Sequence, residues 1–392
     1  MSDHVVIVAA KRTPVGAFMG ALSGATAVQL GAAAIKGALE AAGLAGKDVQ
    51  EVIMGCVLPA GLGQAPARQA ALAAGIPVGT PATTINKMCG SGLKAIMMAA
   101  DQIRAGDIDI AVAGGLESMS NAPYLLPKAR AGMRMGHGEV LDHMLYDGLQ
   151  SPFDGQLMGC FADNTADKYK FTRAEQDEFA AESTRRAMRA VEAGDFAAEV
   201  VSVTVKSRKG ETVVEKDETP YNVDLAKIPK LKAAFRKDGT VTAASSSSIS
   251  DGAAAVVLMS EKAALARGLK PLARIVGYAS HAHEPEWFTT APSGAIKKTL
   301  DRLQWRADQV DLYEVNEAFA VVTMAAMRDI GFGHDRTNVN GGACALGHPV
   351  GATGARIITT LVHALRKRGG KRGLASLCIG GGEATALAIE IV

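Results

Sequence analysis

The chain has 392 residues, which is enough for two or three domains of ordinary size. Hydrophobic residues make up 48% of it and charged residues 21%, a composition typical of a globular protein and unlike that of a disordered one. The formal net charge is only +2, which argues against a nucleic-acid-binding protein, because such proteins carry a concentrated basic surface.

Five cysteines are spread over the chain, at positions 56, 89, 160, 344 and 378. Their odd number and wide spacing argue against a disulfide framework, and the absence of a CxxC or clustered Cys/His pattern argues against a metal site. No stretch contains 18 uncharged apolar residues, so we expect no membrane span. The apolar run 5–10 lacks a preceding basic segment, which favours a buried strand over a signal peptide. We therefore expect a bacterial cytoplasmic protein; organelle import of a processed precursor is the alternative.

The first part of the chain alternates between strand and helix patterns. The predicted elements are a strand at 5–10, a helix at 27–44, a strand at 52–54, a helix at 93–104 and a strand at 108–113. The last strand runs into Gly114 and Gly115. This alternation predicts a sheet with helices on both faces.

Residues 121–244 break that rhythm. Prolines and glycines precede a charged helix predicted at 173–193, and an irregular basic stretch follows it. The cationic residues of that stretch are Lys206, Arg208, Lys209, Lys227, Lys230, Lys232, Arg236 and Lys237. The pattern of strands and helices resumes with an apolar strand at 251–259. We therefore interpret 121–244 as an inserted loop domain.

A weak internal repeat relates the two ends of the chain. The segment 34–39 recurs at 295–300, an offset of 261 residues (295 − 34), and a glycine-rich segment with an acid follows each copy, at 114–117 and 380–383. At the same offset, Val49 meets Val310 and Val52 meets Tyr313. Such ordered matches predict two related α/β halves. The predicted domains are an N-terminal half at 1–120 completed by 245–268, the inserted loop domain at 121–244, and a C-terminal half at 269–392.

The first chemical motif surrounds Cys89, in a glycine-rich turn at 86–95 that leads into a predicted helix. Free N–H groups and the positive end of the helix dipole favour a thiolate at such a position. Small neighbours also leave room for a thioester to approach. A buried structural cysteine is the alternative interpretation of this motif taken alone.

Three further motifs place reactive or polar groups at turns and strand ends. His348 lies in a glycine-rich turn before a predicted helix, which favours a general base over a structural histidine. Cys378 ends a strand and precedes three glycines, including Gly380, whose N–H groups suit an oxyanion hole. Asn316 lies where another predicted strand gives way to a helix.

Together, these four motifs resemble those of the thiolase family in their order and spacing, and the match runs from Arg12 to the C-terminal glycines. The resemblance implies an α/β, thiolase-like fold, with two similar halves stacked as a layered αβαβα core and the inserted loop domain projecting from the first half. It also implies coenzyme A thioesters as substrates, with no cofactor and no metal.

For the site, the resemblance implies roles for five residues. Cys89 is the nucleophile that forms the acyl-enzyme, and His348 takes its proton. Cys378 is the second base, which removes a proton from the methyl group of acetyl-CoA. His348 and a water on Asn316 hold the enolate oxygen, and the N–H groups of Cys89 and Gly380 hold the tetrahedral intermediate.

The resemblance also indicates where the substrate binds. Ser247 aligns with the family's serine that contacts the pantetheine arm, and the basic residues between 206 and 237 are candidates for contact with the phosphates. The remaining expected substrate-binding residues are Leu157, Met158, Phe288, Ala318 and Phe319.

The expected pocket departs from the short-chain biosynthetic branch of the family. Leu157 replaces a common histidine, and Phe288 and Thr289 replace a methionine and a glycine. If Phe288 and Thr289 both point inward, they fill space and predict a short pocket that prefers acetoacetyl-CoA.

The activity implied is acetyl-CoA C-acetyltransfer, the reversible Claisen condensation of two acetyl-CoA to acetoacetyl-CoA and coenzyme A. The expected assembly is a homotetramer, a dimer of dimers joined through the loop at 125–138. One alternative is a broad-range degradative 3-ketoacyl-CoA thiolase. The others are a ketoacyl synthase-like enzyme, against which Cys378 argues, and a non-catalytic acyl-CoA binder, against which the retained catalytic residues argue.

Overall fold

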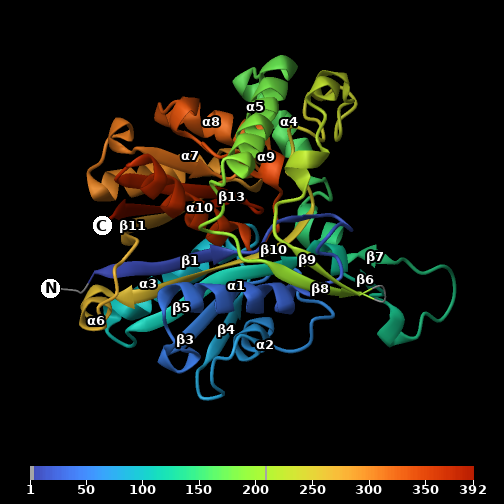
Figure 1. The fold of residues 1–392 in the computed structure, drawn as a ribbon. Helices are drawn as coiled ribbons and strands as arrows, with labels where there is room; N and C mark the ends of the chain where they lie inside the picture. Colours follow the sequence, from blue (N-terminus) through green and yellow to red (C-terminus); the bar gives the residue numbers. More distant parts are fainter. Residues whose placement is uncertain (1–3, 208–209) are drawn as a thin grey trace.

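The computed structural model describes residues 4–207 and 210–392. Arg208 and Lys209, two of the cationic residues named above, lie outside the described residues. Within these ranges, no helix is both long enough and apolar enough to cross a membrane. Figure 1 shows the first half of the fold in blue and cyan, the second in orange and red, and the segment between them in green and yellow.

The first half is built on five strands. Across the sheet they are ordered β1 (Val5–Arg12), β10 (Ser250–Ser260), β5 (Ile110–Ser118), β3 (Glu51–Gly55) and β4 (Ala82–Ile85). Strand β10 is antiparallel to both of its neighbours, whereas β5, β3 and β4 run parallel. All eleven residues of β10 are buried, as expected for a strand covered by helices on both faces.

Three helices cover this sheet. Helices α1 (Ala27–Ala42) and α2 (Pro66–Ala73) pack on the outer face, and α3 (Ser91–Ala105) packs on the inner face. Helix α1 begins at a capping box, in which Thr26 Oγ1 accepts the Gln29 N–H and the Gln29 side chain accepts the Thr26 N–H.

The second half repeats the strand order of the first. Its strands are β11 (Ala273–Ala282), β14 (Glu383–Ile391), β13 (Arg372–Ile379) and β12 (Leu312–Val315). They correspond, in order and relative direction, to β1, β10, β5 and β3. Its helices are α7 (Ala291–Leu303), α8 (Ala320–Ile330), the short α9 (Ala343–Leu346) and α10 (Thr353–Arg368). The two halves are therefore related, as the repeat at an offset of 261 predicted.

The two inner helices form the middle layer of the molecule. Residues of α3 and α10 share one hydrophobic core with strands from both halves, which gives the helix–sheet–helix–sheet–helix order visible in Figure 1. Strand β1 also pairs with β11, so ten strands, including the short β2 (Gly16–Ala17), form one continuous hydrogen-bonded sheet. The two stacked half-sheets are thus joined at one edge.

One part of the predicted repeat is wrong. Gly114 and Gly115 lie inside β5, not at its end. Glycine is needed there because the backbone of neighbouring segments approaches both residues closely. A Cβ at Gly114 would lie 2.0 Å from the Ala254 carbonyl oxygen, and one at Gly115 would lie 2.0 Å from the Gly351 carbonyl oxygen. Gly381 and Gly382, by contrast, have positive φ in the turn between β13 and β14. The two glycine segments therefore serve different purposes.

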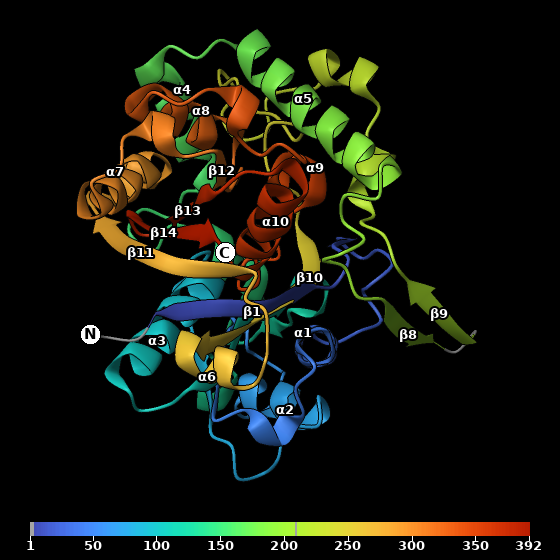
Figure 2. The same cartoon turned by 60° about the vertical axis from the view of Figure 1, so that its left-hand side comes forward.

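The segment between β5 and β10 contains the predicted inserted loop domain. Its strands and helices are β6 (Tyr124–Leu125), β7 (Leu141–Asp142), a π-helix (Met144–Leu149), α4 (Met158–Tyr169), α5 (Arg173–Glu192), β8 (Val203–Ser207) and β9 (Gly210–Val214), and α6 (Glu261–Ala266) follows β10. Helix α5 begins at Arg173, as predicted, and a capping box made by Thr172 and Glu175 precedes it. Figure 2 shows α5 lying across the second half while the β8–β9 hairpin projects away from the core. The limits of 121–244 as a domain remain a prediction.

Candidate active site

Cys89 lies in a tight turn immediately before α3. Met88 has a positive φ of 46°, an uncommon conformation for a residue with a side chain. The hydroxyl of Ser91 secures the turn, because it donates to the Met88 carbonyl oxygen at 2.6 Å and accepts the Lys87 N–H at 2.8 Å. The turn is therefore fixed by the first residue of the helix that it precedes.

The surroundings of Cys89 favour the thiol in the resting protein. Burial raises the pKa of Cys89 to about 11, although the backbone N–H groups of Gly380 and of Cys89 itself act in the opposite direction. The expectation that the helix start favours a thiolate at Cys89 is therefore not met, because desolvation outweighs the backbone donors. Removal of the proton requires a base.

His348 has the geometry of that base. Its Nδ1 lies 2.7 Å from Thr353 Oγ1, and the Thr353 hydroxyl donates its proton to the Pro349 carbonyl oxygen at 3.0 Å. Thr353 Oγ1 must therefore accept from Nδ1–H, which leaves Nε2 of a neutral His348 as an acceptor. Nε2 has no hydrogen-bond partner among the described residues. Burial, with a contribution from Arg356, lowers the pKa of His348 to about 3, so the ring stays neutral over the physiological range.

Cys378 is fully buried near the end of β13 and packs in the same cluster as Phe288 and Phe319. Burial raises its pKa well above the ordinary value, and the neighbouring Cys89 adds to this increase. The structure thus brings the two candidate catalytic thiols close together, and both are protonated at neutral pH.

Asn316 lies just after β12 and is almost fully buried. Its backbone N–H donates to the Ser376 carbonyl oxygen at 3.0 Å. Neither atom of its side-chain amide has a hydrogen-bond partner in the described parts of the chain. A buried, uncommitted amide is suited to bind a substrate oxygen or a water.

Cys89, His348 and Gly380 open into one cavity of about 420 Å³, which we call the main cavity. All six predicted substrate-binding residues line it, namely Leu157, Met158, Ser247, Phe288, Ala318 and Phe319. Asn316 and Cys378 are not among its lining residues. Thr289 does not line this cavity: it is buried beside α4, where its hydroxyl lies 2.5 Å from that of Thr165. Of the two side chains expected to shorten the pocket, only Phe288 therefore faces it.

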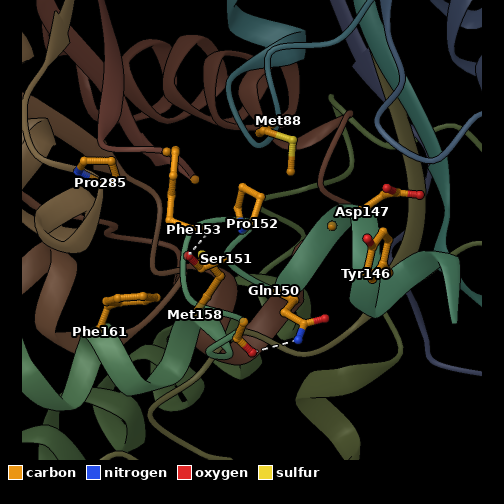
Figure 3. Close-up of a pocket in the computed structure, with 14 residues that line it drawn as sticks. Met88, Tyr146, Asp147, Gln150, Ser151, Pro152, Phe153, Met158, Phe161 and Pro285 are labelled. Atoms are coloured by element: carbon orange, nitrogen blue, oxygen red, sulfur yellow. Dashed lines mark hydrogen bonds between the residues drawn. The ribbon is translucent and has the colours of Figure 1, made fainter. Parts of the chain in front are cut away.

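A second cavity of about 430 Å³, which we call the side cavity, adjoins the main cavity and was not predicted. The two share Gly148, Met158 and Gly380 as lining residues. Figure 3 shows Met88 on one side of the side cavity and the loop 150–153 on the other. No sequence motif marks this cavity, because its wall depends on how the loop after the π-helix folds back toward Gly380.

Buried side chains behind the site were also not given roles from the sequence. Glu317 accepts hydrogen bonds from Ser183 Oγ at 2.7 Å, Asn338 Nδ2 at 2.8 Å and the Cys344 N–H at 3.1 Å, and so anchors the segment that leads to His348. Glu117, near the end of β5, is another such buried side chain. Within residues 4–207 and 210–392, no group of three or more His, Cys, Asp or Glu side chains is arranged to hold a metal ion.

Comparisons with known proteins agree with this geometry. Residues 5–262 match the family model described as thiolase, N-terminal domain, and residues 269–391 match thiolase, C-terminal domain. The chain is 52% identical to an acetyl-CoA acetyltransferase of Pseudomonas aeruginosa over 389 residues, covering 99% of both proteins. It is 50% identical to acetyl-CoA acetyltransferase 2 of Arabidopsis thaliana, covering 99% of this chain and 97% of that protein.

A solved structure gives the same answer for the fold. The crystal structure of the Bacillus anthracis acetyl-CoA acetyltransferase superposes with a TM-score of 0.97 at 43% sequence identity, covering 100% of this chain and 99% of that one. Both family models and full-length relatives match across the two halves and the segment between them. The chain therefore belongs to the thiolase family.

Proposed function

We propose that this protein is an acetyl-CoA C-acetyltransferase, which catalyses the reversible Claisen condensation of two acetyl-CoA to acetoacetyl-CoA and coenzyme A. The observation that carries the proposal is the free Nε2 of a neutral His348 in the same cavity as Cys89 and Gly380. Relatives of about 50% identity over their full length bear this name, which supports the same activity here.

The first half-reaction transfers the acetyl group to Cys89. His348 Nε2 takes the thiol proton as the sulfur attacks the thioester carbonyl, and the N–H groups of Cys89 and Gly380 stabilise the oxyanion. The carbon–sulfur bond to coenzyme A then breaks, and the leaving thiolate takes a proton from Cys378. The raised pKa of Cys378 makes the thiolate that remains a strong base.

The second half-reaction forms the carbon–carbon bond. The Cys378 thiolate removes a proton from the methyl group of a second acetyl-CoA, and His348 and a water on Asn316 stabilise the enolate oxygen. The carbanion attacks the acetyl group on Cys89, acetoacetyl-CoA forms, and the released Cys89 thiolate recovers its proton from His348. The same groups run the reverse reaction, thiolysis.

Coenzyme A would bind along the side of the main cavity formed by the inserted loop domain and the segment after it. Ser247 is our candidate for contact with the pantetheine arm. Three cations of the basic stretch pair with nearby carboxylates: Lys206 with Glu211, Lys227 with Asp224, and Arg236 with Asp167 and Asp238. Lys232 and Lys237 are exposed and flank the cavity-lining residues Ala234 and Phe235, so they are our candidates for phosphate contacts.

Acetoacetyl-CoA is our proposed preferred substrate for thiolysis, because Phe288 lines the main cavity and fills space beside the acyl site. The competing reading is a broad-range 3-ketoacyl-CoA thiolase, and the side cavity beyond Met158 is the observation that favours it. Comparing kcat/KM for C4, C6 and C8 3-ketoacyl-CoA separates them. A value for C8 equal to or above that for C4 would reject the acetoacetyl preference.

The activity itself is tested by adding coenzyme A to the magnesium enolate of acetoacetyl-CoA and following the loss of absorbance. Incubation with acetyl-CoA and peptide mass spectrometry should then place the acetyl group on Cys89. Acetylation at Cys378 would overturn the assignment of the nucleophile. Absence of thiolysis with every chain length would favour a ketoacyl synthase-like enzyme or an acyl-CoA binder.

We further propose a homotetramer in the cytoplasm. Strand β6 and the loop from it to β7 carry apolar side chains exposed to solvent in the isolated chain, which suits an interface. They are Tyr124, Leu126, Met133, Met135 and Val140. Light scattering tests the assembly. The mass of a dimer would show that this loop does not join dimers into a tetramer, and the mass of a monomer would reject both the dimer and the tetramer.

A further inference from the structure

Glu117 is a fully buried carboxylate near the end of β5. One of its oxygens, Oε2, accepts the N–H groups of Val57 at 2.9 Å and Gly351 at 2.8 Å. The other oxygen accepts the N–H of Leu58 at 3.1 Å and contacts the thiol of Cys56 at 3.7 Å. Three backbone donors, with no cation among its contacts in the described residues, thus stabilise its charge.

These donors belong to two separate loops around the site. Val57 and Leu58 follow β3 and pack in the cluster that includes Met88 and Cys89. Gly351 lies three residues after His348, and Val350 belongs to that same cluster. One carboxylate therefore joins the loop behind the nucleophile to the loop of the base.

The glycine at 351 fits this junction closely. A Cβ at that position would lie 2.6 Å from Glu117 Oε2, which is shorter than any ordinary contact. The Gly351 carbonyl oxygen is in turn close to β5, since a Cβ at Gly115 would lie 2.0 Å from it. The loop after His348 thus approaches β5 and Glu117 as closely as its backbone allows.

We propose that Glu117 is a positioning residue that holds the Cys89 turn and the His348 loop in register, which rests on the function proposed above. Among the described residues, the titratable groups that interact with Glu117 are Cys56, which contacts it, and Cys89. Asp251, on the adjacent strand β10, instead accepts from Ser118 Oγ at 3.1 Å and the Ser120 N–H at 2.9 Å. The carboxylate of Glu117 contributes to the raised pKa of Cys89, so its charge can be read out at the nucleophile.

The test is Glu117→Gln in the full-length protein, which keeps the size of the side chain but removes its charge and places an NH₂ group against backbone donors. Two results are expected. The kcat for thiolysis falls about 10- to 100-fold with little change in KM, because the reacting groups are misplaced while the substrate site is kept. The pH profile of Cys89 alkylation by iodoacetamide, with Cys89 identified by peptide mass spectrometry, shifts to lower pH because a nearby negative charge is lost.

Asp251→Asn is the matched control, since it alters a buried carboxylate with similar partners on the neighbouring strand. It should leave the alkylation profile and kcat near those of the wild type. Glu117→Asp should keep the alkylation profile and lose kcat. Gly351→Ala, which places a methyl group against Glu117, should lower kcat in the same way and serves if Glu117→Gln does not fold.

A wild-type kcat and a wild-type alkylation profile in Glu117→Gln would overturn the proposal. An equal loss of kcat in Asp251→Asn would also overturn it, because removing any buried carboxylate would then have the same effect. So would an unchanged kcat in Gly351→Ala, because crowding the Glu117 contact would then not disturb the site. Alkylation requires no turnover. If the wild-type protein shows no thiolysis while the alkylation profile of Glu117→Gln still shifts, the proposed function fails and the place of Glu117 beside Cys89 stands.

Discussion

The starts of helices α3 and α10 are equivalent points in the two halves, and they hold their chemistry in different ways. The helices pack reciprocally there: a Cβ at Gly92 would lie 2.8 Å from the Ala355 nitrogen, and one at Gly354 would lie 2.2 Å from the Leu93 nitrogen. Each helix begins with a hydroxyl residue, Ser91 or Thr353. The same packing thus presents two different turns to one cavity.

The difference lies in what each hydroxyl binds. Both hydrogen bonds of Ser91 go to the backbone, where they stabilise a turn that contains a positive φ at Met88. Thr353 makes one bond to the backbone and one to the imidazole of His348, so it selects the tautomer of a side chain. In the first turn, the hydroxyl fixes the backbone conformation. In the second, it fixes which nitrogen of His348 carries the proton.

The largest expected effect comes from removing the base. His348→Ala should lower kcat for thiolysis by about 10²- to 10⁴-fold, the usual contribution of a general base. His363→Ala is the control: this half-buried histidine on α10 bonds to the Ala10 carbonyl oxygen and does not line the main cavity. Steady-state kinetics on both variants checks the assignment. Equal losses of kcat in the two variants would contradict the assignment, because a histidine outside the cavity would then be as important as His348.

A smaller effect should follow from removing the hydroxyl that fixes the tautomer of His348. Thr353→Val keeps the shape of the side chain but removes its hydroxyl, and we expect kcat to fall about 10- to 100-fold, the size of loss seen when a group that orients a metal-ligating histidine is removed. Thr353→Ser should retain most activity. Thr359→Val, which removes a buried hydroxyl whose one hydrogen bond among the described residues goes to the Ala355 carbonyl oxygen of the same helix, should leave kcat nearly unchanged. Full activity in Thr353→Val would remove the distinction between the two turns.

The sequence allowed the chemistry of these turns to be predicted better than their electrostatics. The repeat at an offset of 261 predicted the two related halves. The resemblance of the four motifs to the thiolase family predicted roles for Cys89, His348, Cys378 and Asn316, of which Cys89 and His348 line one cavity. The protonation of Cys89 was predicted wrongly, because it depends on desolvation by residues distant in the chain. Glu117 was not given a role, since backbone N–H groups, which are its partners, leave no mark in a sequence.

Ser91→Ala should act on stability more than on the chemical step. It removes two hydrogen bonds that hold the Cys89 turn, which should lower the free energy of unfolding by about 1–3 kcal/mol. We expect a smaller loss of kcat than in Thr353→Val, because the two hydrogen bonds of the hydroxyl go to the backbone of Lys87 and Met88 and not to a reacting group. Urea denaturation and kinetics on the same samples test this. An unchanged unfolding free energy with a kcat loss as large as that of Thr353→Val would contradict it.

The smallest expected effect is a difference in acid sensitivity between the two turns. The folded-state pKa of His348 is about 3, whereas the unfolded chain takes up the proton near 6.5. The stability that this difference gives is fully present above pH 6.5 and is lost as the pH falls from 6.5 toward 3, with a slope of up to about 1.4 kcal/mol per pH unit. The thiol of Cys89 is neutral throughout that range and contributes no such slope.

Thermal unfolding at pH 7.5 and pH 5.0 separates the two cases. Going to pH 5.0 should lower the Tm of the wild type and of Cys89→Ser by a similar amount, and that of His348→Gln by less, because the variant has no imidazole to protonate on unfolding. Glu117, whose pKa burial raises to about 7, acts in the opposite direction between pH 7 and 4.5, since its folded form binds the proton more tightly. Glu117 and the other titratable groups are present in all three proteins and contribute equally to each fall in Tm. Only the difference in that fall between His348→Gln and the other two proteins therefore reports on His348. An equal fall in Tm for His348→Gln and the wild type would mean that the imidazole is already charged in the folded protein, and the base assigned to the second turn would then have no free Nε2.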